Sequence, residues 1–117
     1  MEYSKLGNTD IEVSKVCVGC MSFGKAGTMH DWTLDEAESE KVIKHALDLG
    51  YNFFDTANGY SAGTSEEYLG RALKKNIARD KVVIASKVYF NLKEDKTPTS
   101  IGRPLKKWHI KHISDTM

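Results

Sequence analysis

The stretch GYNFFDTANGYSAGTSEEYLGRAL, residues Gly50–Leu73, together with VVIASK further along the chain, gives the clearest indication of the fold of this protein. Residues 52–55 have the pattern of a short buried strand that ends in a carboxylate, and residues 82–87 that of the next strand, which ends in an amine. Between them lies a segment with helical periodicity, residues 64–73. The order strand, helix, strand predicts a parallel β/α arrangement.

The ends of these two strands carry polar side chains that suit acid catalysis. The carboxyl ends of parallel strands meet at one edge of a sheet, where ligands and catalytic groups collect. We therefore expect Asp55 and Lys87 to form an ion pair there, with Tyr60 on the loop above them.

The chemistry that fits this trio is proton donation by a phenol. A free tyrosine titrates near pKa ~10, so a neighbouring cation is needed to stabilise the phenolate as its proton leaves. Lys87 would supply that charge, and Asp55 would keep the ammonium protonated. A structural Asp–Lys pair beneath a surface tyrosine has the same residue types, which alone leave both interpretations open.

Glycine positions and helix-start patterns predict the remaining strands and helices. A GNTD turn between residues 3–6 and 11–13 predicts a β-hairpin, and residues 16–19 follow as the first parallel strand. Two capping-box pairs predict where helices begin: Thr33 with Glu36 for the first helix, and Thr64 with Glu67 for the second. Gly50 predicts the end of the first helix.

Three segments together resemble the aldo-keto reductase family. They are KLGNTDIEVSKVCVGCMSFG (residues 5–24), the opening stretch, and DKVVIASKV (residues 80–88). The resemblance implies an α/β fold: the N-terminal part of a (β/α)8 TIM barrel, preceded by a β-hairpin. Such a barrel usually takes ~250 residues. The 117 residues here have room for about three barrel strands, so we expect residues 1–90 to form a truncated barrel.

The family resemblance also implies roles for individual residues. Asp55, Tyr60 and Lys87 match three members of the family's Asp-Tyr-Lys-His catalytic tetrad, with Tyr60 protonating an aldehyde or ketone while NADPH supplies hydride. The expected cofactor contacts are Gly19, Cys20, Met21 and Asp55, because the first three match the segment that lies against the nicotinamide.

The expected substrate contacts are Tyr60 and Trp32. Loops after barrel strands commonly line the substrate pocket, and such pockets are mostly apolar. A surface aromatic packed on its own loop explains Trp32 equally well, so both interpretations stay open.

The fourth tetrad member has no match. Residues 91–117 resemble no segment of the family and are expected to be a divergent tail, frameshifted near residue 97 or disordered. His109 and His112 are candidate substitutes, although solvated tail residues are the simpler interpretation. We therefore expect the chain alone to be weakly active or inactive. The alternative is a non-catalytic remnant that acts as an interaction module or does not fold stably, with strand edges open to self-association.

Composition and charge limit the kinds of partner that the chain is expected to bind. With 40% hydrophobic residues and a net charge of +1, the chain predicts neither nucleic-acid nor membrane binding, and without a targeting signal the expected location is cytoplasmic. Cys17 and Cys20 have CxxC spacing, but on a strand these positions point to opposite faces. No metal site is predicted.

Overall fold

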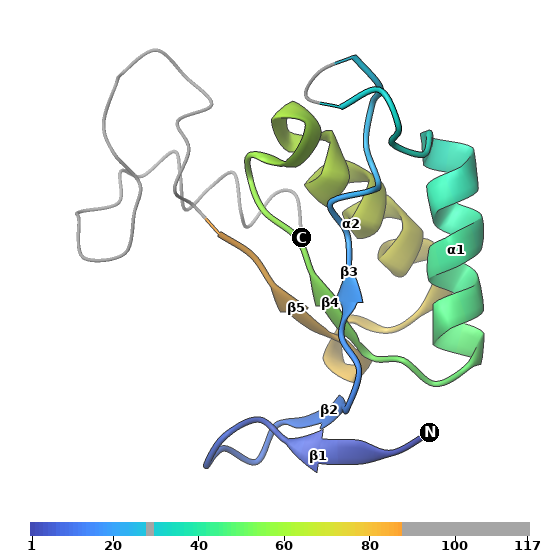
Figure 1. The fold of residues 1–117 in the computed structure, drawn as a ribbon. Helices are drawn as coiled ribbons and strands as arrows, with labels where there is room; N and C mark the ends of the chain where they lie inside the picture. The colour runs from blue at the N-terminus through green and yellow to red at the C-terminus, as the bar shows by residue number, and fades with distance from the viewer. Residues whose placement is uncertain (28–29, 88–117) are drawn as a thin grey trace.

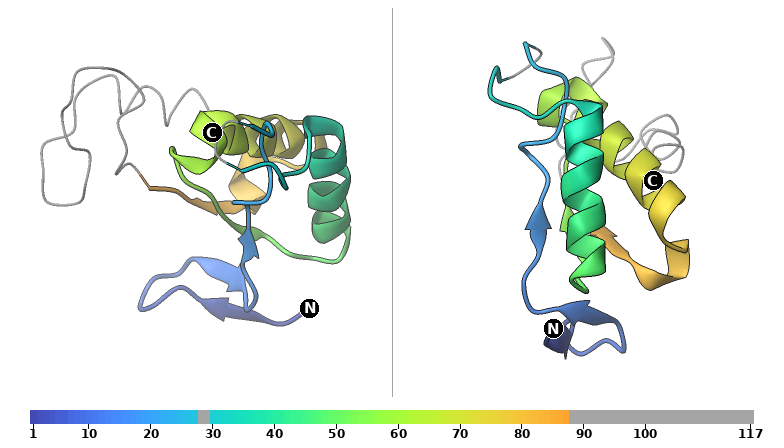
Figure 2. Two further views of the ribbon diagram at one scale, coloured as in Figure 1. Left: turned by 45° about the horizontal axis from the view of Figure 1, so that its top comes forward. Right: turned by 90° about the vertical axis from the view of Figure 1, so that its right-hand side faces the viewer.

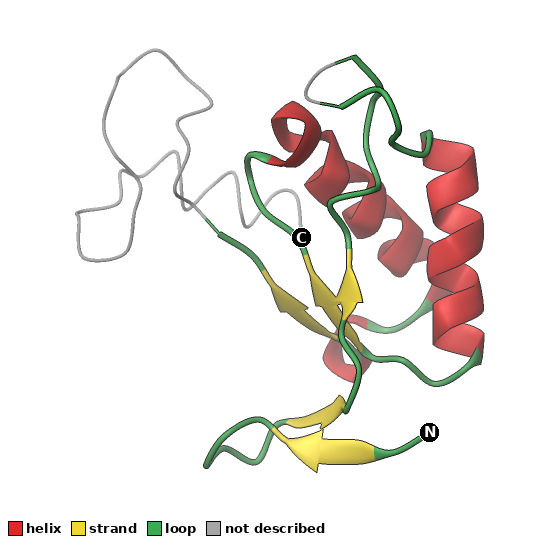
Figure 3. Ribbon diagram, viewed as in Figure 1, coloured by secondary structure: helices red, strands yellow, loops and turns green. Residues whose placement is uncertain are grey.

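The computed structural model describes residues 1–27 and 30–87 (Figure 1). The elements in chain order are β1 (Tyr3–Lys5), β2 (Glu12–Ser14), β3 (Val18–Gly19), α1 (Glu36–Asp48), β4 (Phe53–Asp55), the 3-10 turn η1 (Tyr60–Gly63), α2 (Thr64–Asn76), the 3-10 turn η2 (Arg79–Lys81) and β5 (Val83–Ala85). Figure 3 shows the same chain with helices and strands in separate colours.

The central feature is a three-stranded parallel sheet in the order β3-β4-β5. Gly19 pairs with Asp55, and Asp55 with Ala85, so the three strands end level with one another. Strands β1 and β2 form the expected antiparallel hairpin, which lies beyond the N-terminal end of β3 (Figure 1). The predicted hairpin and parallel strands are confirmed.

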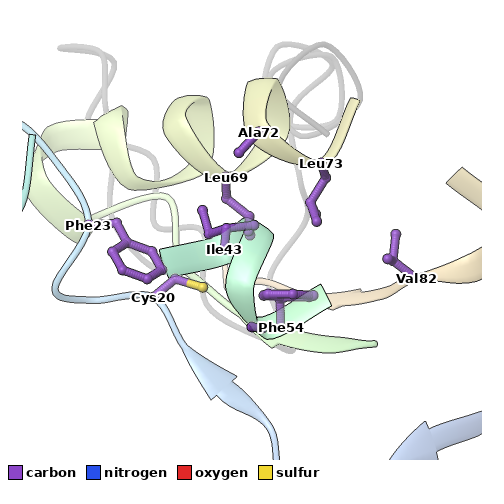
Figure 4. Close-up of a cluster of buried hydrophobic side chains, with 9 residues drawn as sticks. Cys20, Phe23, Ile43, Phe54, Leu69, Ala72, Leu73 and Val82 are labelled. Atoms are coloured by element: carbon purple, nitrogen blue, oxygen red, sulfur yellow. The ribbon is translucent and has the colours of Figure 1, made fainter. Parts of the chain in front are cut away.

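Both helices pack on one face of this sheet, side by side (Figure 2). Phe54 of β4 points toward them and is completely buried, as are Ile43 of α1 and Leu69 of α2 (Figure 4). Cys20 and Phe23, just after β3, complete this core on one side. Each large apolar side chain buried in this way contributes about 1.5–3 kcal/mol, so the layer of helices on sheet is the main source of stability.

The helices begin at other residues than the capping-box patterns predict. The N-cap of α1 is Asp35, whose carboxylate accepts a hydrogen bond from the Glu38 amide at 2.9 Å, so the prediction of Thr33 as the cap is wrong. Either oxygen-bearing side chain suits an N-cap, but the backbone of Leu34 is hydrogen-bonded to Ser22 and Gly24 of the loop after β3, so the helix begins beyond Leu34.

The second helix start is also different. Helix α2 is preceded by Gly63 at φ +96°, and no side chain caps it. Thr64 instead donates to the Ser61 carbonyl oxygen at 2.7 Å and accepts from the Lys25 amide at 2.8 Å, so its hydroxyl joins two loops. Gly50, at φ +97°, ends α1 as predicted.

The loops after β3 and β4 touch at a point where only glycine fits. A Cβ on Gly24 would lie 2.4 Å from the Ser61 Cβ and 2.5 Å from its Oγ. A hydrogen in place of a side chain is therefore required for the close approach of the two loops.

We predict that Gly24→Ala lowers the free energy of unfolding by about 2–4 kcal/mol, since the clash with the buried Ser61 can be relieved only by moving a loop. The matched control is Gly27→Ala. Gly27 has φ +84° but open space at its Cβ position, so only the backbone penalty of about 1–2 kcal/mol should appear. Urea unfolding of both variants measures the difference, and equal losses would show that the contact with Ser61 is not limiting.

Candidate active site

The level ends of β4 and β5 bring Asp55 and Lys87 together on the face opposite the helices. The Lys87 Nζ lies 2.9 Å from Asp55 Oδ2 and 3.1 Å from Asp55 Oδ1. The same ammonium donates to the Tyr60 hydroxyl at 3.2 Å. The expected ion pair, on adjacent parallel strands and with the tyrosine beside it, is confirmed as geometry.

The Lys87 ammonium has its three hydrogens directed to three groups. Besides the Asp55 carboxylate and Tyr60, it donates to the Thr56 carbonyl oxygen at 2.9 Å. It also lies 5.0 Å from the centroid of the Tyr60 ring. Because the ammonium donates to the phenol oxygen, the phenol's own hydrogen remains available for another acceptor.

The electrostatic balance at Lys87 favours its charged form. Burial acts to lower the pKa of the ammonium, but its hydrogen bonds to Asp55 and Tyr60, together with the charges of these two groups, outweigh the effect of burial, so the pKa of Lys87 is raised. Lys87 therefore stays a cation throughout the neutral range.

The turn that carries Tyr60 has an unusual backbone. Ser61 (φ 48°, ψ 46°) and Ala62 (φ 54°, ψ 35°) both adopt the left-handed conformation, which is costly for residues with a Cβ. Ser61 is fully buried against the loop after β3. Packing of that loop thus holds the turn immediately beyond Tyr60, an arrangement that residue patterns did not predict.

Besides Asp55, three residues are expected to contact a cofactor, and they differ in how far they are exposed. Gly19 is exposed, with open space where a side chain would begin, and it pairs with Asp55. Met21 is 43% exposed. Cys20 lies in the core with no exposed surface, so a cofactor contact by Cys20 stays a prediction that this conformation does not favour.

The loop after β3 also holds the expected substrate contact Trp32. Its ring is 56% exposed and stacks on His30, with 4.6 Å between ring centroids. Packing within its own loop, one of the two interpretations left open, is therefore observed, and a substrate contact stays a prediction. His109 and His112 lie outside the described residues.

The two cysteines flank β3 and differ in burial. Cys17 is exposed and Cys20 is buried. Burial raises the pKa of the Cys20 thiol to about 12, and burial with the nearby Asp55 charge raises that of Cys17. Neither thiol is activated as a nucleophile. In residues 1–27 and 30–87, no group of three or more His, Cys, Asp or Glu side chains is placed to hold a metal ion.

Three buried polar residues behind the site, and the partly buried Ser86, were not predicted. Ser65 contacts both the Cys20 carbonyl oxygen and the Thr56 hydroxyl, and Glu66 accepts from the Ser86 hydroxyl. Ser65, Glu66 and Thr56 have no exposed surface. Ser65 and Glu66 lie between Thr64 and Glu67, the expected capping-box pair, and the residue pattern contained no signal for their own contacts.

A parallel sheet with helices on one face, and with an Asp-Lys-Tyr cluster at its carboxyl edge, is the arrangement expected at the beginning of a β/α barrel. The model of the aldo/keto reductase family matches residues 15–115, and the chain belongs to this family. The match includes residues 91–115, for which the sequence showed no resemblance; the division at residue 90 stays a prediction.

The similar proteins have names of reductases or dehydrogenases. The chain is 46% identical to versiconal hemiacetal acetate reductase of Aspergillus parasiticus over 107 residues, which cover 88% of this chain and 31% of that protein. It is 40% identical to the aldo-keto reductase YhdN of Bacillus subtilis, covering 81% of this chain and 28% of that one.

Solved structures agree with the fold. The holo form of the aldo-keto reductase AKR11C1 from Bacillus halodurans matches with a TM-score of 0.69 and 31% identity, over 99% of this chain and 35% of that one. The thermostable aldo-keto reductase Tm1743, with the inhibitor epalrestat, matches with a TM-score of 0.59 and 32% identity, over 74% and 31%. The chain thus spans about a third of the length of these proteins.

The length and apolar character of a helix determine whether it can cross a membrane. Neither α1 nor α2, the helices of the described part of the chain, combines the length and the apolar character needed to cross a bilayer.

We predict that Asp55→Asn lowers the pKa of Lys87, because burial then acts on the ammonium without the carboxylate that offsets it. In the parent, the pKa of Lys87 is raised, so the Asp55–Lys87 pair stabilises the fold below the ordinary lysine pKa of about 10.4. This stability is lost as the pH rises through the pKa of Lys87 in the folded state. Side-chain NMR titration of lysine measures the midpoint of Lys87. The exposed Asp48→Asn is the control, and a Lys87 midpoint that is the same in both variants would contradict the prediction.

Proposed function

We propose that this chain carries the proton-donating part of a carbonyl reductase that converts aldehydes or ketones to alcohols. The observation that supports it most is the single ammonium of Lys87, which contacts both Asp55 and the phenol oxygen of Tyr60. A structural ion pair has no need of a phenol within 3.2 Å of the cation. The names of the relatives, among them a hemiacetal acetate reductase, support a carbonyl-derived substrate.

Tyr60 is the proposed acid in this reaction. Its hydroxyl hydrogen is directed away from Lys87, which already donates to the same oxygen, so it can bond to a substrate carbonyl oxygen. As that proton moves to the substrate, negative charge develops on the phenol oxygen. The Lys87 ammonium is in place to stabilise this charge, and Asp55 holds the ammonium in position.

The proposed cofactor is NADPH, which supplies hydride to the carbonyl carbon when bound. The open space over Gly19 and the exposed Met21 fit a flat ring close to Asp55, whereas a side chain at Gly19 would reduce that space. The preference for NADPH over NADH rests on the family resemblance, and the structure supports only the nicotinamide end of the site.

The chain taken alone is proposed to be weakly active or inactive. Asp55, Tyr60 and Lys87 account for three of the four expected tetrad members, and the chain covers about a third of its relatives. Misplacing reacting groups by about 1 Å can reduce a rate ~10²-fold. In the described residues, β3 and β5 each pair on one side only, which supports the further proposal of self-association.

Fluorescence titration with NADPH separates the proposed enzyme from its alternative. Micromolar binding by the purified chain would support a reductase site. No binding, together with a cooperative thermal transition, would support a folded module without a cofactor, and a non-cooperative transition would support a chain that is unstable alone.

We predict that Tyr60→Phe lowers carbonyl reduction by ~10²–10⁴-fold or more and leaves NADPH affinity nearly unchanged, since it removes one proton donor and little packing. The assay is NADPH consumption by the chain completed with the C-terminal part of a related aldo-keto reductase after Val88. Tyr68→Phe, which removes a phenol hydroxyl from α2, is the control. A Tyr60→Phe variant that keeps half of the parent rate would exclude Tyr60 as the acid.

A further inference from the structure

The first turn of α2 sends two adjacent buried side chains to the ends of all three parallel strands. The Ser65 hydroxyl lies 2.6 Å from the Cys20 carbonyl oxygen, directly after β3, and 2.9 Å from the Thr56 hydroxyl, directly after β4. The Glu66 carboxyl accepts from the Ser86 hydroxyl at 2.6 Å, directly after β5. The three contacted residues each stand one position beyond the last residue of a strand.

The hydrogen-bond directions in this network are determined. Ser65 has a single hydroxyl hydrogen, and a carbonyl oxygen can only accept, so Ser65 donates to Cys20. Thr56 must then donate to Ser65. Each hydroxyl is thus fixed in one orientation, and rotating one of them breaks a buried hydrogen bond.

Side-chain alternation connects this network to the candidate active site. Successive residues of an extended chain point to opposite faces, so Thr56 and Ser86 face α2 whereas Asp55 and Lys87 face the open side. The backbone couples the two sides further. The Thr56 amide donates to the Ala85 carbonyl at 2.9 Å, and the Thr56 carbonyl accepts from Lys87 Nζ at 2.9 Å.

Stability alone does not explain polar residues at these positions. Burying a hydroxyl or a carboxyl costs free energy that apolar side chains of similar size would not. The neighbouring positions that serve packing, Leu69 and Phe54, are apolar. Polar side chains in the α2 first turn add directional contacts, which apolar packing cannot provide.

We propose that Ser65 and Glu66 are positioning residues, which hold the ends of the three strands from behind and so set the separation of Asp55, Lys87 and Tyr60 on the open face. The inference rests on the proposed function, in which that separation matters for proton transfer.

The test compares Glu66→Ala and Ser86→Ala with Glu66→Gln, which keeps an oxygen that accepts from Ser86. Glu67→Ala, at the exposed neighbouring position, is the control. NMR of lysine side chains in the full chain follows the titration midpoint of Lys87, and unfolding is measured in parallel. Where the parent reduces a carbonyl substrate, kcat and KM are compared as well.

The expected result is a lower Lys87 midpoint in Glu66→Ala and Ser86→Ala, because contacts with Asp55 and Tyr60 lengthen, and near-parent values in Glu66→Gln and Glu67→Ala. In an active protein, kcat should fall about 10–100-fold in the first two, with KM within about threefold.

The proposal would be overturned if Glu66→Ala and Ser86→Ala unfold at a lower denaturant concentration but keep the parent's Lys87 titration midpoint and kcat. Such a result would show a purely structural role. If Glu66→Ala does not fold, Ser86→Ala decides, since it removes one hydroxyl only. If the parent reduces no carbonyl, the proposed function fails, while the Lys87 titration midpoints still decide whether the contact of Glu66 with Ser86 positions the site.

Discussion

Successive side chains of the short strand β4 point to opposite faces of the sheet, and this alternation sets the positions of both the core and the candidate site. In β4, Phe54 points into the core between α1 and α2, and Asp55, the next residue, points to the opposite face. Burial of Phe54 fixes which way the strand faces, because a shift of one residue would expose the phenylalanine and bury the carboxylate. The apolar core therefore determines where the charged site lies.

The candidate site combines the Asp55–Lys87 ion pair with a strained backbone turn next to Tyr60. Lys87 donates hydrogen bonds to Asp55 and to the Thr56 carbonyl oxygen, and its interactions with Asp55 and Tyr60 keep its pKa raised. Tyr60 precedes two left-handed residues that are maintained by the packing of a neighbouring loop. Backbone strain that the surroundings hold in place is common where a side chain must be kept in a precise position.

Much of the fold was predictable because its signals are local. A buried strand that ends in a charged residue and a glycine that ends a helix both follow from the chemistry of a few consecutive residues. The pairing of Asp55 with Lys87 was also predictable, since parallel strands must end at a common edge. The helix starts were not, because Thr33 and Asp35 are both acceptable caps and only packing distinguishes them.

Residue types at fixed spacing were enough to predict the order of strands and helices along the chain, the edge of the sheet at which Asp55 and Lys87 meet, and the family resemblance. The left-handed turn after Tyr60, the burial of Cys20 and the contacts of Ser65 and Glu66 behind the strands emerged only from the folded chain. These features join segments that are distant in the chain, and a hydroxyl or carboxyl gives no indication in the sequence of which distant group it will bind.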